Sequence, residues 1–273
     1  MQSRFTVLDD TRRHPDLAAR ITDILTMVAS PIEEITGLTL PPTVRYRLTT
    51  PKAWRRETID AKVRTLIQDT ADLALTPEQT KPVALGLKLA RIVPVLVWPL
   101  VNGATATAAD GEQETRIAPR ALHHGGLLAD EPVLVQMIAH ELVHHVQAAH
   151  NDTTAWQTLF PEHRAMPHPR ITSMFLEGHA RWTDQQITQH LYGAPVDDGQ
   201  APRSLRYRLH KHIPGIRHLG PSRAAYEEGA RFFAYVAAHA GLDQINRVWK
   251  DTALLPTKDE FAHPQSWLDR TAP

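Results

Sequence analysis

Apolar residues recur every three or four positions along much of the chain, a period that predicts amphipathic helices. Long helices are expected over residues 14–37, 53–75, 131–151, 171–193 and 222–241. Pro31 is expected to break the first of these and to leave a short second helix that ends at Gly37. Residues 242–250 and 266–270 predict two short helices near the end of the sequence. Helices therefore make up most of the predicted structure.

Strand patterns are fewer and shorter. Residues 41–50 alternate between apolar and polar side chains, as a half-buried strand does. Residues 89–107 are rich in β-branched side chains and predict one or two strands. After a turn at Asp110 and Gly111, residues 114–122 form a candidate edge strand that Pro119 interrupts. The expected fold class is α+β, mostly helical with a small β-sheet.

No repeat and no long linker divides the 273 residues, so we expect a single domain over 1–273. Within it, an N-terminal lobe of about 1–150 would include the helix at 131–151. A C-terminal helical lobe would cover about 151–273, and a cleft is expected where the two lobes meet.

Composition narrows the possible partners and ligands. The 30 basic and 30 acidic side chains cancel, so nothing indicates a nucleic-acid groove. There is no cysteine, and a metal ion must therefore be held by nitrogen and oxygen. The N-terminus carries charge where a signal peptide needs an apolar core. The longest apolar run, residues 92–101, is too short to span a bilayer and contains two prolines. A cytoplasmic protein with no membrane partner is expected.

The helix at 131–151 contains the motif H-E-x-x-H, formed by His140, Glu141 and His144. Asp130 is a suitable N-cap for this helix, with a proline in the first turn. Histidines four residues apart lie on the same face of a helix, so both imidazoles can reach one metal ion. The intervening glutamate then lies beside the metal, where a general base for a metal-activated water belongs. The motif predicts a catalytic zinc site.

A third ligand must come from elsewhere, and the residues offer three candidates. His150 would complete a longer motif, but that motif needs a glycine where this chain has Gln147. If the helix continues, His150 lies about 240° round from His144 and cannot reach the metal. Glu177 lies in the next strong helix among apolar neighbours, as a buried ligand would. Gly178 after it permits close approach of two helices, as a shared metal requires. His179 is the remaining candidate.

Three segments carry a resemblance to a known family. They read "HELVHHVQ", "SMFLEGHARWTDQQI" and "AYEEGARFFAYVAAHAGLDQINRVWKDTALLPTKDEFAHPQSWLDR". With the E-G-H-A step and the closing L-P-T to W-L-x-R pattern, the chain resembles the actinobacterial zinc-dependent metalloproteases of zincin-like, gluzincin type. These are hydrolases of unknown substrate. The likeness covers about residues 85–270 and leaves the first eighty unmatched.

The resemblance implies Zn²⁺ held by His140, His144 and Glu177, with Glu141 as the catalytic acid–base. Thermolysin-like gluzincins place an acidic residue four positions after the glutamate ligand, to orient a histidine. This chain has Arg181 there. Asp184, one turn further along the same face, is the substitute candidate.

Peptide hydrolysis also needs a group that stabilises the oxyanion. Tyr226 is the first candidate, because it lies in the first turns of the helix that begins near Ser222. The alternative is that Tyr226 is a core residue beside Phe232 and Phe233. Three histidines in the loop before that helix are the next candidates: His210, His212 and His218.

The function expected from these residues is a zinc-dependent peptidase that acts on peptide or small-molecule amide substrates. One alternative is a metal-dependent biosynthetic enzyme that reuses the site, either a small-molecule hydrolase or an iron oxygenase, because two histidines and a carboxylate also bind iron. Another is a non-catalytic binding protein. The intact Glu141 argues against the last of these. The sequence does not indicate an oligomeric state.

Overall fold

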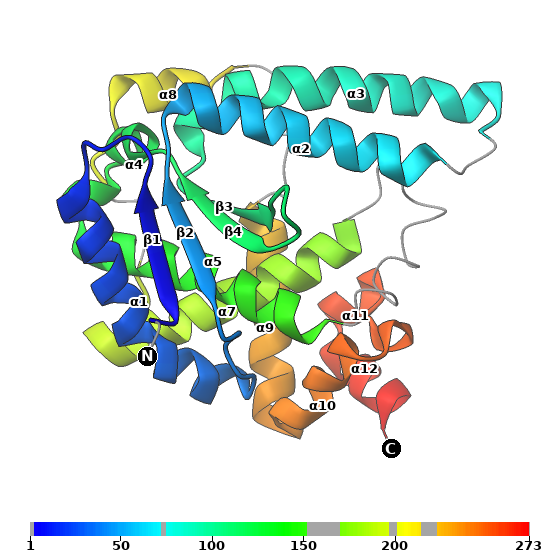
Figure 1. The fold of residues 1–273 in the computed structure, drawn as a ribbon. Helices are drawn as coiled ribbons and strands as arrows, with labels where there is room; N and C mark the ends of the chain where they lie inside the picture. Colours follow the sequence, from blue (N-terminus) through cyan, green and yellow to red (C-terminus); the bar gives the residue numbers. More distant parts are fainter. Residues whose placement is uncertain (1–2, 72–74, 152–169, 197–200, 214–222, 273) are drawn as a thin grey trace.

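The computed structural model describes residues 3–71, 75–151, 170–196, 201–213 and 223–272. Helices surround a small four-stranded sheet, which confirms the predicted α+β class (Figure 1). One large hydrophobic core joins the sheet to four of the long helices and to the C-terminal segments, and a second, small cluster surrounds Trp54 and Trp98. The division into two lobes stays a prediction.

The sheet has the strand order β1-β2-β4-β3. The strands are β1 (Phe5–Asp9), β2 (Val44–Leu48), β3 (Ala104–Thr107) and β4 (Gln113–Ile117). β2 lies parallel to β1 and β4, whereas β3 and β4 are antiparallel across a turn at Gly111. The predicted edge strand at 114–122 is therefore wrong in position, because β4 is an inner strand that ends before Pro119. The edge strand of this hairpin is β3.

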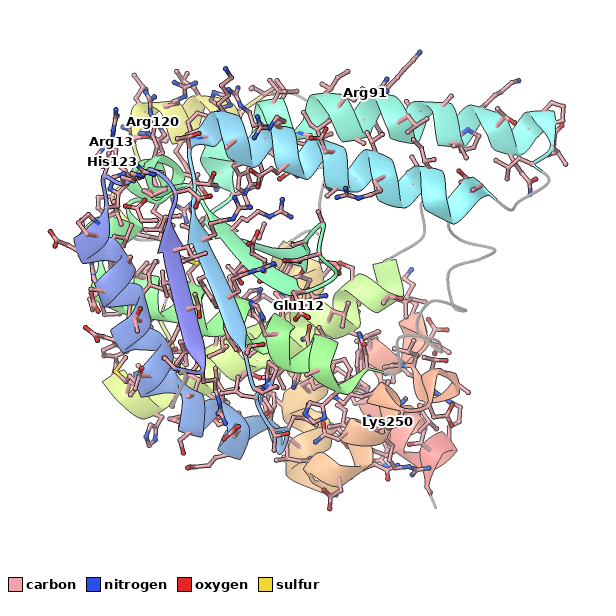
Figure 2. All side chains as sticks on the ribbon, in the orientation of Figure 1. Arg13, Arg91, Glu112, Arg120, His123 and Lys250 are labelled. Atoms are coloured by element: carbon pink, nitrogen blue, oxygen red, sulfur yellow. The ribbon has the colours of Figure 1, made fainter. Side chains whose placement is uncertain are left out.

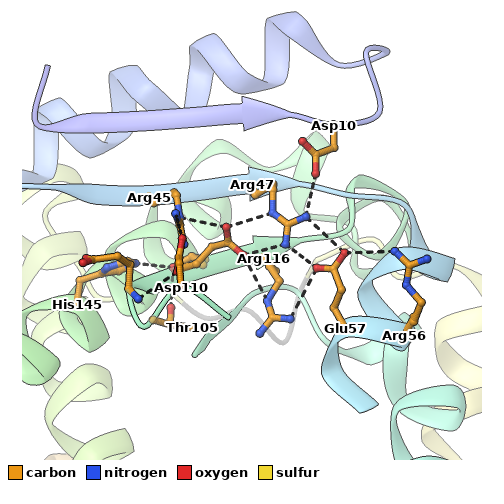
Figure 3. Close-up of polar contacts among 12 residues, drawn as sticks. Asp10, Arg45, Arg47, Arg56, Glu57, Thr105, Asp110, Arg116 and His145 are labelled. Atoms are coloured by element: carbon orange, nitrogen blue, oxygen red, sulfur yellow. Dashed lines mark hydrogen bonds and ion pairs between the residues drawn. The ribbon is translucent and has the colours of Figure 1, made fainter. Parts of the chain in front are cut away.

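The two faces of the sheet differ in polarity because side chains alternate along a strand. On β2, Val44, Tyr46 and Leu48 are buried in the main core. The Tyr46 hydroxyl donates to the carbonyl of Ile138 in α5 (Glu131–His150). Arg45 and Arg47 point to the opposite face, where they pair with Asp110 and Glu57 (Figure 3).

The first helix, α1 (Pro15–Thr36), is continuous through Pro31, so the predicted break is wrong. Val28 and Ile32 on either side of the proline are fully buried against the core. That burial outweighs the one backbone hydrogen bond that a proline removes. The helix does end at Gly37, in the left-handed conformation that glycine adopts without strain.

Two long helices, α2 (Pro51–Ala71) and α3 (Pro77–Val97), form a hairpin along one edge of the molecule (Figure 1). The strands predicted over 89–107 are therefore wrong up to Val97. A capping box at Thr76 starts α3, and packing against α2 overrides the preference of its β-branched residues for strands. Only Ala104–Thr107 of that segment is a strand, after a short turn of 3-10 helix, η1 (Trp98–Leu100).

Among the described residues, one helix is long and apolar enough to cross a membrane by length and composition alone. It is α3 together with η1, Pro77–Leu100, whose most apolar 18-residue window has a mean hydropathy of 1.7. The expectation based on residues 92–101 underestimated this segment, because it did not include the first half of α3. Only 22% of its most apolar window is buried.

The other long helices lie on the face of the sheet opposite to α2. α5 packs against α1 and α7 (Arg170–Tyr192), and α7 packs against α9 (Arg223–Ala240). Shorter helices make up the rest of the helical structure in the described residues. They are α4 (Pro119–Gly125), η2 (Leu127–Ala129), α8 (Leu205–Lys211), α10 (Leu242–Asn246), η5 (Arg247–Trp249), η6 (Thr252–Leu254), α11 (Lys258–Ala262) and α12 (Pro264–Thr271). The predicted helices at 242–250 and 266–270 correspond to α10 with η5 and to α12.

Candidate metal centre

The helix α5 presents both motif histidines from one face. Asp130 caps it as predicted, its side chain accepting from the backbone N–H of Val133. His140 and His144 are one turn apart, with ring centroids separated by 5.0 Å. Both rings lie close to α7, because α5 packs against that helix and the two imidazoles face Glu177.

Glu177 from α7 meets the two histidines. Its Oε2 lies 3.2 Å from Nε2 of His140 and 3.7 Å from Nε2 of His144. One donor atom from each residue lies within 4.8 Å of the others, close enough to bind one metal ion. Two imidazole nitrogens and a carboxylate oxygen are a donor set that zinc enzymes use, and a further coordination position stays open for a reactant. The residues present therefore fit a zinc ion.

Two glycines bring α9 against this centre. A Cβ at Gly178 would lie 2.5 Å from Cα of Gly229, and a Cβ at Gly229 would lie 2.3 Å from the carbonyl oxygen of Met174. The prediction that Gly178 permits a close helix approach is confirmed, but the partner is α9 and not the motif helix. Tyr226, one turn before Gly229, thereby reaches Glu177 and hydrogen-bonds its carboxylate.

Asp184 holds the first histidine, as expected for the substitute residue. Its Oδ2 accepts from Nδ1 of His140 at 2.9 Å. The other oxygen of Asp184 accepts from Gln136 at 3.0 Å and from Arg181 at 3.1 Å. With Nδ1 turned to a carboxylate, Nε2 of His140 faces the centre, which is the orientation a metal ligand needs.

Gln147 holds the second histidine, a role that the sequence did not reveal. Its Nε2 donates to the carbonyl of Leu176 at 2.8 Å, and this fixes the orientation of the amide. Its Oε1 then accepts from Nδ1 of His144 at 2.9 Å. The Nε2 of His144 is left with its lone pair toward Glu177. Gln147 thus links both metal helices and sets the tautomer of one ligand.

The charges of the centre favour a cation. Burial alone would lower the pKa of His140, but hydrogen bonds to Asp184 and Glu177 raise it to about 10. Burial opposes ionisation of Glu177, yet its contacts with His140 and His144 lower its pKa to about 2. Burial, together with the Glu177 charge, raises the pKa of Tyr226, so the phenol stays protonated and can donate. Surroundings that stabilise an imidazolium also favour a divalent ion in its place.

Glu141 lies beside the three donors, among residues of β3. Its Oε2 accepts from the Thr105 hydroxyl at 2.7 Å. A Cβ at Gly103 would lie 2.8 Å from Glu141, so only glycine leaves room for the carboxylate. Behind Thr105, a hydrogen-bonded chain continues through Thr115 to the buried ring of His145, with separations of 2.6 and 2.9 Å. Burial lowers the pKa of His145 to about 4, so this ring is neutral.

A cavity opens on each side of the centre. The larger, about 500 Å³, is lined by His140, Glu141 and Tyr226 and by Gly103, the residue before β3. The smaller, about 280 Å³, is lined by His144 and Glu177 and by Thr105 within β3. The donors therefore lie between two hollows that follow the same edge strand.

The remaining sequence candidates lie away from the donors. The helix α5 continues to His150, whose Nε2 lies 2.8 Å from the carbonyl oxygen of Thr39. His179 is buried among aromatic rings, which lowers its pKa to about 3, and it lies 3.1 Å from Nε2 of Gln147. His210 contacts the carbonyl of Leu96. His212 ends α8 as an exposed residue, and His218 lies outside the described residues.

Comparison with known proteins gives one family and one structure. Residues 218–268 match the model of the zincin-like metallopeptidase family. This segment contains Tyr226 but none of the three donors. A crystal structure from Chloroflexus aurantiacus, described as "a putative hydrolase with a novel fold", aligns with 99% of this chain and 91% of its own. The TM-score is 0.56 and the sequence identity is 17%, a likeness that shows the fold alone. No curated protein matches the chain.

The two matches carry different information. The family model matches a segment in the C-terminal part of the chain, whereas the structural likeness covers nearly all of the chain and shows its fold. The family implies a metal ion, and the structure holds a His/His/Glu group fit to bind one. The chain is therefore similar to zincin-like metallopeptidases in sequence over α9 to α12.

Proposed function

We propose that the protein is a zinc-dependent metallopeptidase of gluzincin type. The observation that carries this proposal is the convergence of His140, His144 and Glu177, with Glu141 and Tyr226 on the cavity side of the same centre. When bound, Zn²⁺ would act as a Lewis acid toward water and toward the substrate carbonyl.

Glu141 has the position of a general base. Its carboxylate would accept the proton that water loses as the water oxygen bonds to the carbonyl carbon. The same proton would then pass to the departing amine as the C–N bond breaks. Thr105 is a positioning residue, because its hydroxyl holds one carboxylate oxygen and leaves the other available.

Tyr226 is suited to stabilise the oxyanion. Its hydroxyl reaches Glu177, and its ring stacks on His140 with centroids 6.2 Å apart. The same hydroxyl could turn to a carbonyl oxygen bound beside these residues, because the cavity next to it is open. This assignment replaces the purely structural alternative, since Tyr226 lines the cavity while Phe232 and Phe233 lie in the core.

The edge strand β3 suits a peptide substrate. An extended peptide can add to an exposed strand through main-chain hydrogen bonds. Such a peptide would run past Gly103 and Thr105, from one cavity to the other, with its scissile bond beside Glu141. A strand-shaped site favours a peptide over a small amide. The cytoplasmic location expected from the sequence stays a prediction.

The test combines metal analysis with an activity assay. Purified protein is expected to contain close to one equivalent of zinc and to cleave a mixture of unstructured peptides, as followed by mass spectrometry. Removal of zinc by a chelator should abolish cleavage, and added zinc should restore it. Protein that retains iron in place of zinc, and that consumes oxygen but cleaves no peptide, would contradict the proposal and support the oxygenase alternative.

A further inference from the structure

The exposed face of α3 is apolar where solvent-facing helices are usually polar. Leu85, Leu89, Ile92 and Val95 are spaced so that they share one side of the helix. Their exposed fractions are 57%, 39%, 53% and 43%. The opposite side faces α2, where Gly86 lies against Leu66. A row of four large apolar residues along one helix is a contiguous patch and not scattered exposure.

The short helix α8 extends this patch. Leu205 and Leu209 are one turn apart and are 65% and 62% exposed. His210 hydrogen-bonds the carbonyl of Leu96 at 2.8 Å, which ties α8 to the end of α3. Both helices lie along the same edge of the molecule (Figure 1). We call the exposed side chains of α3 and α8 the α3–α8 ridge.

The charges on the ridge are positive with one exception. Its exposed cations are Lys81, Lys88, Arg91, Arg206, Arg208 and Lys211. In the two helices the only acidic residue is Glu78, in the first turn of α3. The whole chain, in contrast, has equal numbers of acidic and basic residues. Arg91 projects from α3 away from the body of the protein (Figure 2). A basic surface with large apolar residues between its cations complements an anionic lipid surface.

The geometry favours a helix that lies flat on a bilayer. Pro77–Leu100 has the length of a membrane span and contains an 18-residue window that is apolar enough for one, yet Lys88 and Arg91 lie near its middle. Charges there would lie at the bilayer centre, which is costly, if the helix crossed the membrane. In a helix parallel to the surface, leucines enter the acyl region while long cationic side chains reach the headgroups.

We propose that the α3–α8 ridge is a docking surface for membranes rich in anionic lipid. This revises the expectation that the protein has no membrane partner. One further observation gives the docking a direction. Tyr207 and Lys211 of α8 and Leu100 after α3 line the larger cavity of the metal centre. A protein docked by the ridge would hold that cavity next to the bilayer and its substrates.

Vesicle binding tests the proposal with the full chain and without any substrate. The probes are vesicles of phosphatidylcholine alone and of phosphatidylcholine with an equal amount of phosphatidylglycerol. We expect the protein to sediment with the second kind only, and added salt to release it because it screens the headgroups. Replacing Lys88 and Arg91 with glutamine should lower the partition coefficient more than tenfold, at about fivefold for each cation removed. Leu85→Gln with Leu89→Gln should lower it comparably.

Lys250→Gln is the matched control, since this exposed cation lies at the opposite edge of the molecule (Figure 2). It should lose less than the ridge variants at the same salt. Equal binding to both kinds of vesicle, binding to neither, or equal loss in the Lys250 control would each overturn the proposal. Self-association that Leu85→Gln removes, without vesicle binding, would identify the ridge as an interface between copies and would also overturn it. Binding does not use the zinc donors, so these outcomes are independent of the peptidase proposal.

Discussion

The metal centre and the outer face of the sheet are both clusters of buried charge, and they are built in opposite ways. On the outer face, arginines of β2 and β4 interleave with carboxylates from four segments (Figure 3). At the centre, nitrogen and oxygen donors point toward one another. The first arrangement satisfies its charges within the chain, whereas the second leaves a place for a cation.

In the sheet cluster, each buried charge meets an opposite charge. Glu114 accepts from Arg47 at 3.1 and 2.9 Å and lies 3.1 Å from Nε of Arg45. Arg47 also donates to Glu57 at 2.5 Å and to Asp10 at 2.8 Å, which links α2 to two strands. The hydrogen bond to Glu114 is the largest of several contacts that raise the pKa of Arg47. A cluster of this kind holds the α2–α3 hairpin to the sheet.

At the metal centre, the hydrogen bonds around the three donors orient the donor side chains instead. Asp184 and Gln147 take up the Nδ1 atoms of His140 and His144, so both Nε2 atoms face Glu177. No lysine or arginine is among the residues that meet these three donor atoms in the described part of the chain. Buried charge alone therefore does not indicate a functional site. Donor atoms that converge with no lysine or arginine side chain among them do indicate a candidate site.

The largest expected effect concerns the general base. Glu141→Gln keeps the size of the side chain and removes its ability to accept a proton. We expect kcat for peptide cleavage to fall by about 10²–10⁴-fold, with zinc content unchanged. Steady-state kinetics and metal analysis measure the two quantities. Glu112→Gln, an exposed glutamate beyond β3, should leave both unchanged. Wild-type turnover in the Glu141 variant would show that the chemistry takes another route.

A substitution in the sheet cluster is expected to lower stability and to leave zinc binding unchanged. Glu114→Gln leaves Arg45 and Arg47 without their shared buried carboxylate, and breaking a buried pair typically costs about 3–5 kcal/mol. Urea denaturation should show this loss in the free energy of unfolding, while zinc affinity of the folded protein stays at the wild-type value. Asp110→Asn removes an exposed partner of Arg45 and should change stability little. If the Glu114 variant is as stable as the wild type, the sheet cluster does not contribute to the free energy of unfolding.

The sequence predicted the elements of the centre better than its contacts. Helical period and capping at Asp130 predicted α5, and apolar neighbours made Glu177 on α7 the candidate ligand, because both signals are local. The segment 89–107 was misassigned because packing between α2 and α3 decides its structure, and no local pattern carries that information. Thr105 and Gln147 were missed for a related reason. Thr105 meets Glu141 only once the sheet has formed, and nothing in either residue type indicates the pairing.

A smaller effect is expected at Tyr226. Tyr226→Phe keeps the ring that stacks on His140 and removes only the hydroxyl. If that hydroxyl stabilises the oxyanion, kcat should fall by about 10²-fold or more with little change in zinc content. Tyr235→Phe on the same helix removes a hydroxyl that donates to Gln265 and should leave kcat unchanged. If the two variants have equal kcat values, another residue that lines the cavity must stabilise the oxyanion.

The smallest effect tests whether orientation of a ligand matters apart from charge balance. In Asp184→Asn, only one oxygen remains. If it stays on Nδ1 of His140, the new amide nitrogen faces Gln136 and Arg181, which are both donors. If the amide turns, its nitrogen faces Nδ1 of His140, and the imidazole proton must move to Nε2, the atom meant for the metal.

Both arrangements weaken the site without removing a ligand, and zinc affinity should fall by about 10–100-fold, as measured by competition with a chelator. Asp243→Asn in α10 changes the net charge equally at an exposed position and should leave the affinity unchanged. If Asp184→Asn binds zinc as tightly as the wild type, the contact between Asp184 and His140 is only structural. Only the three converging donors would then distinguish the metal centre from the sheet cluster. The residues around the donors would have a structural role, as the residues of the sheet cluster have.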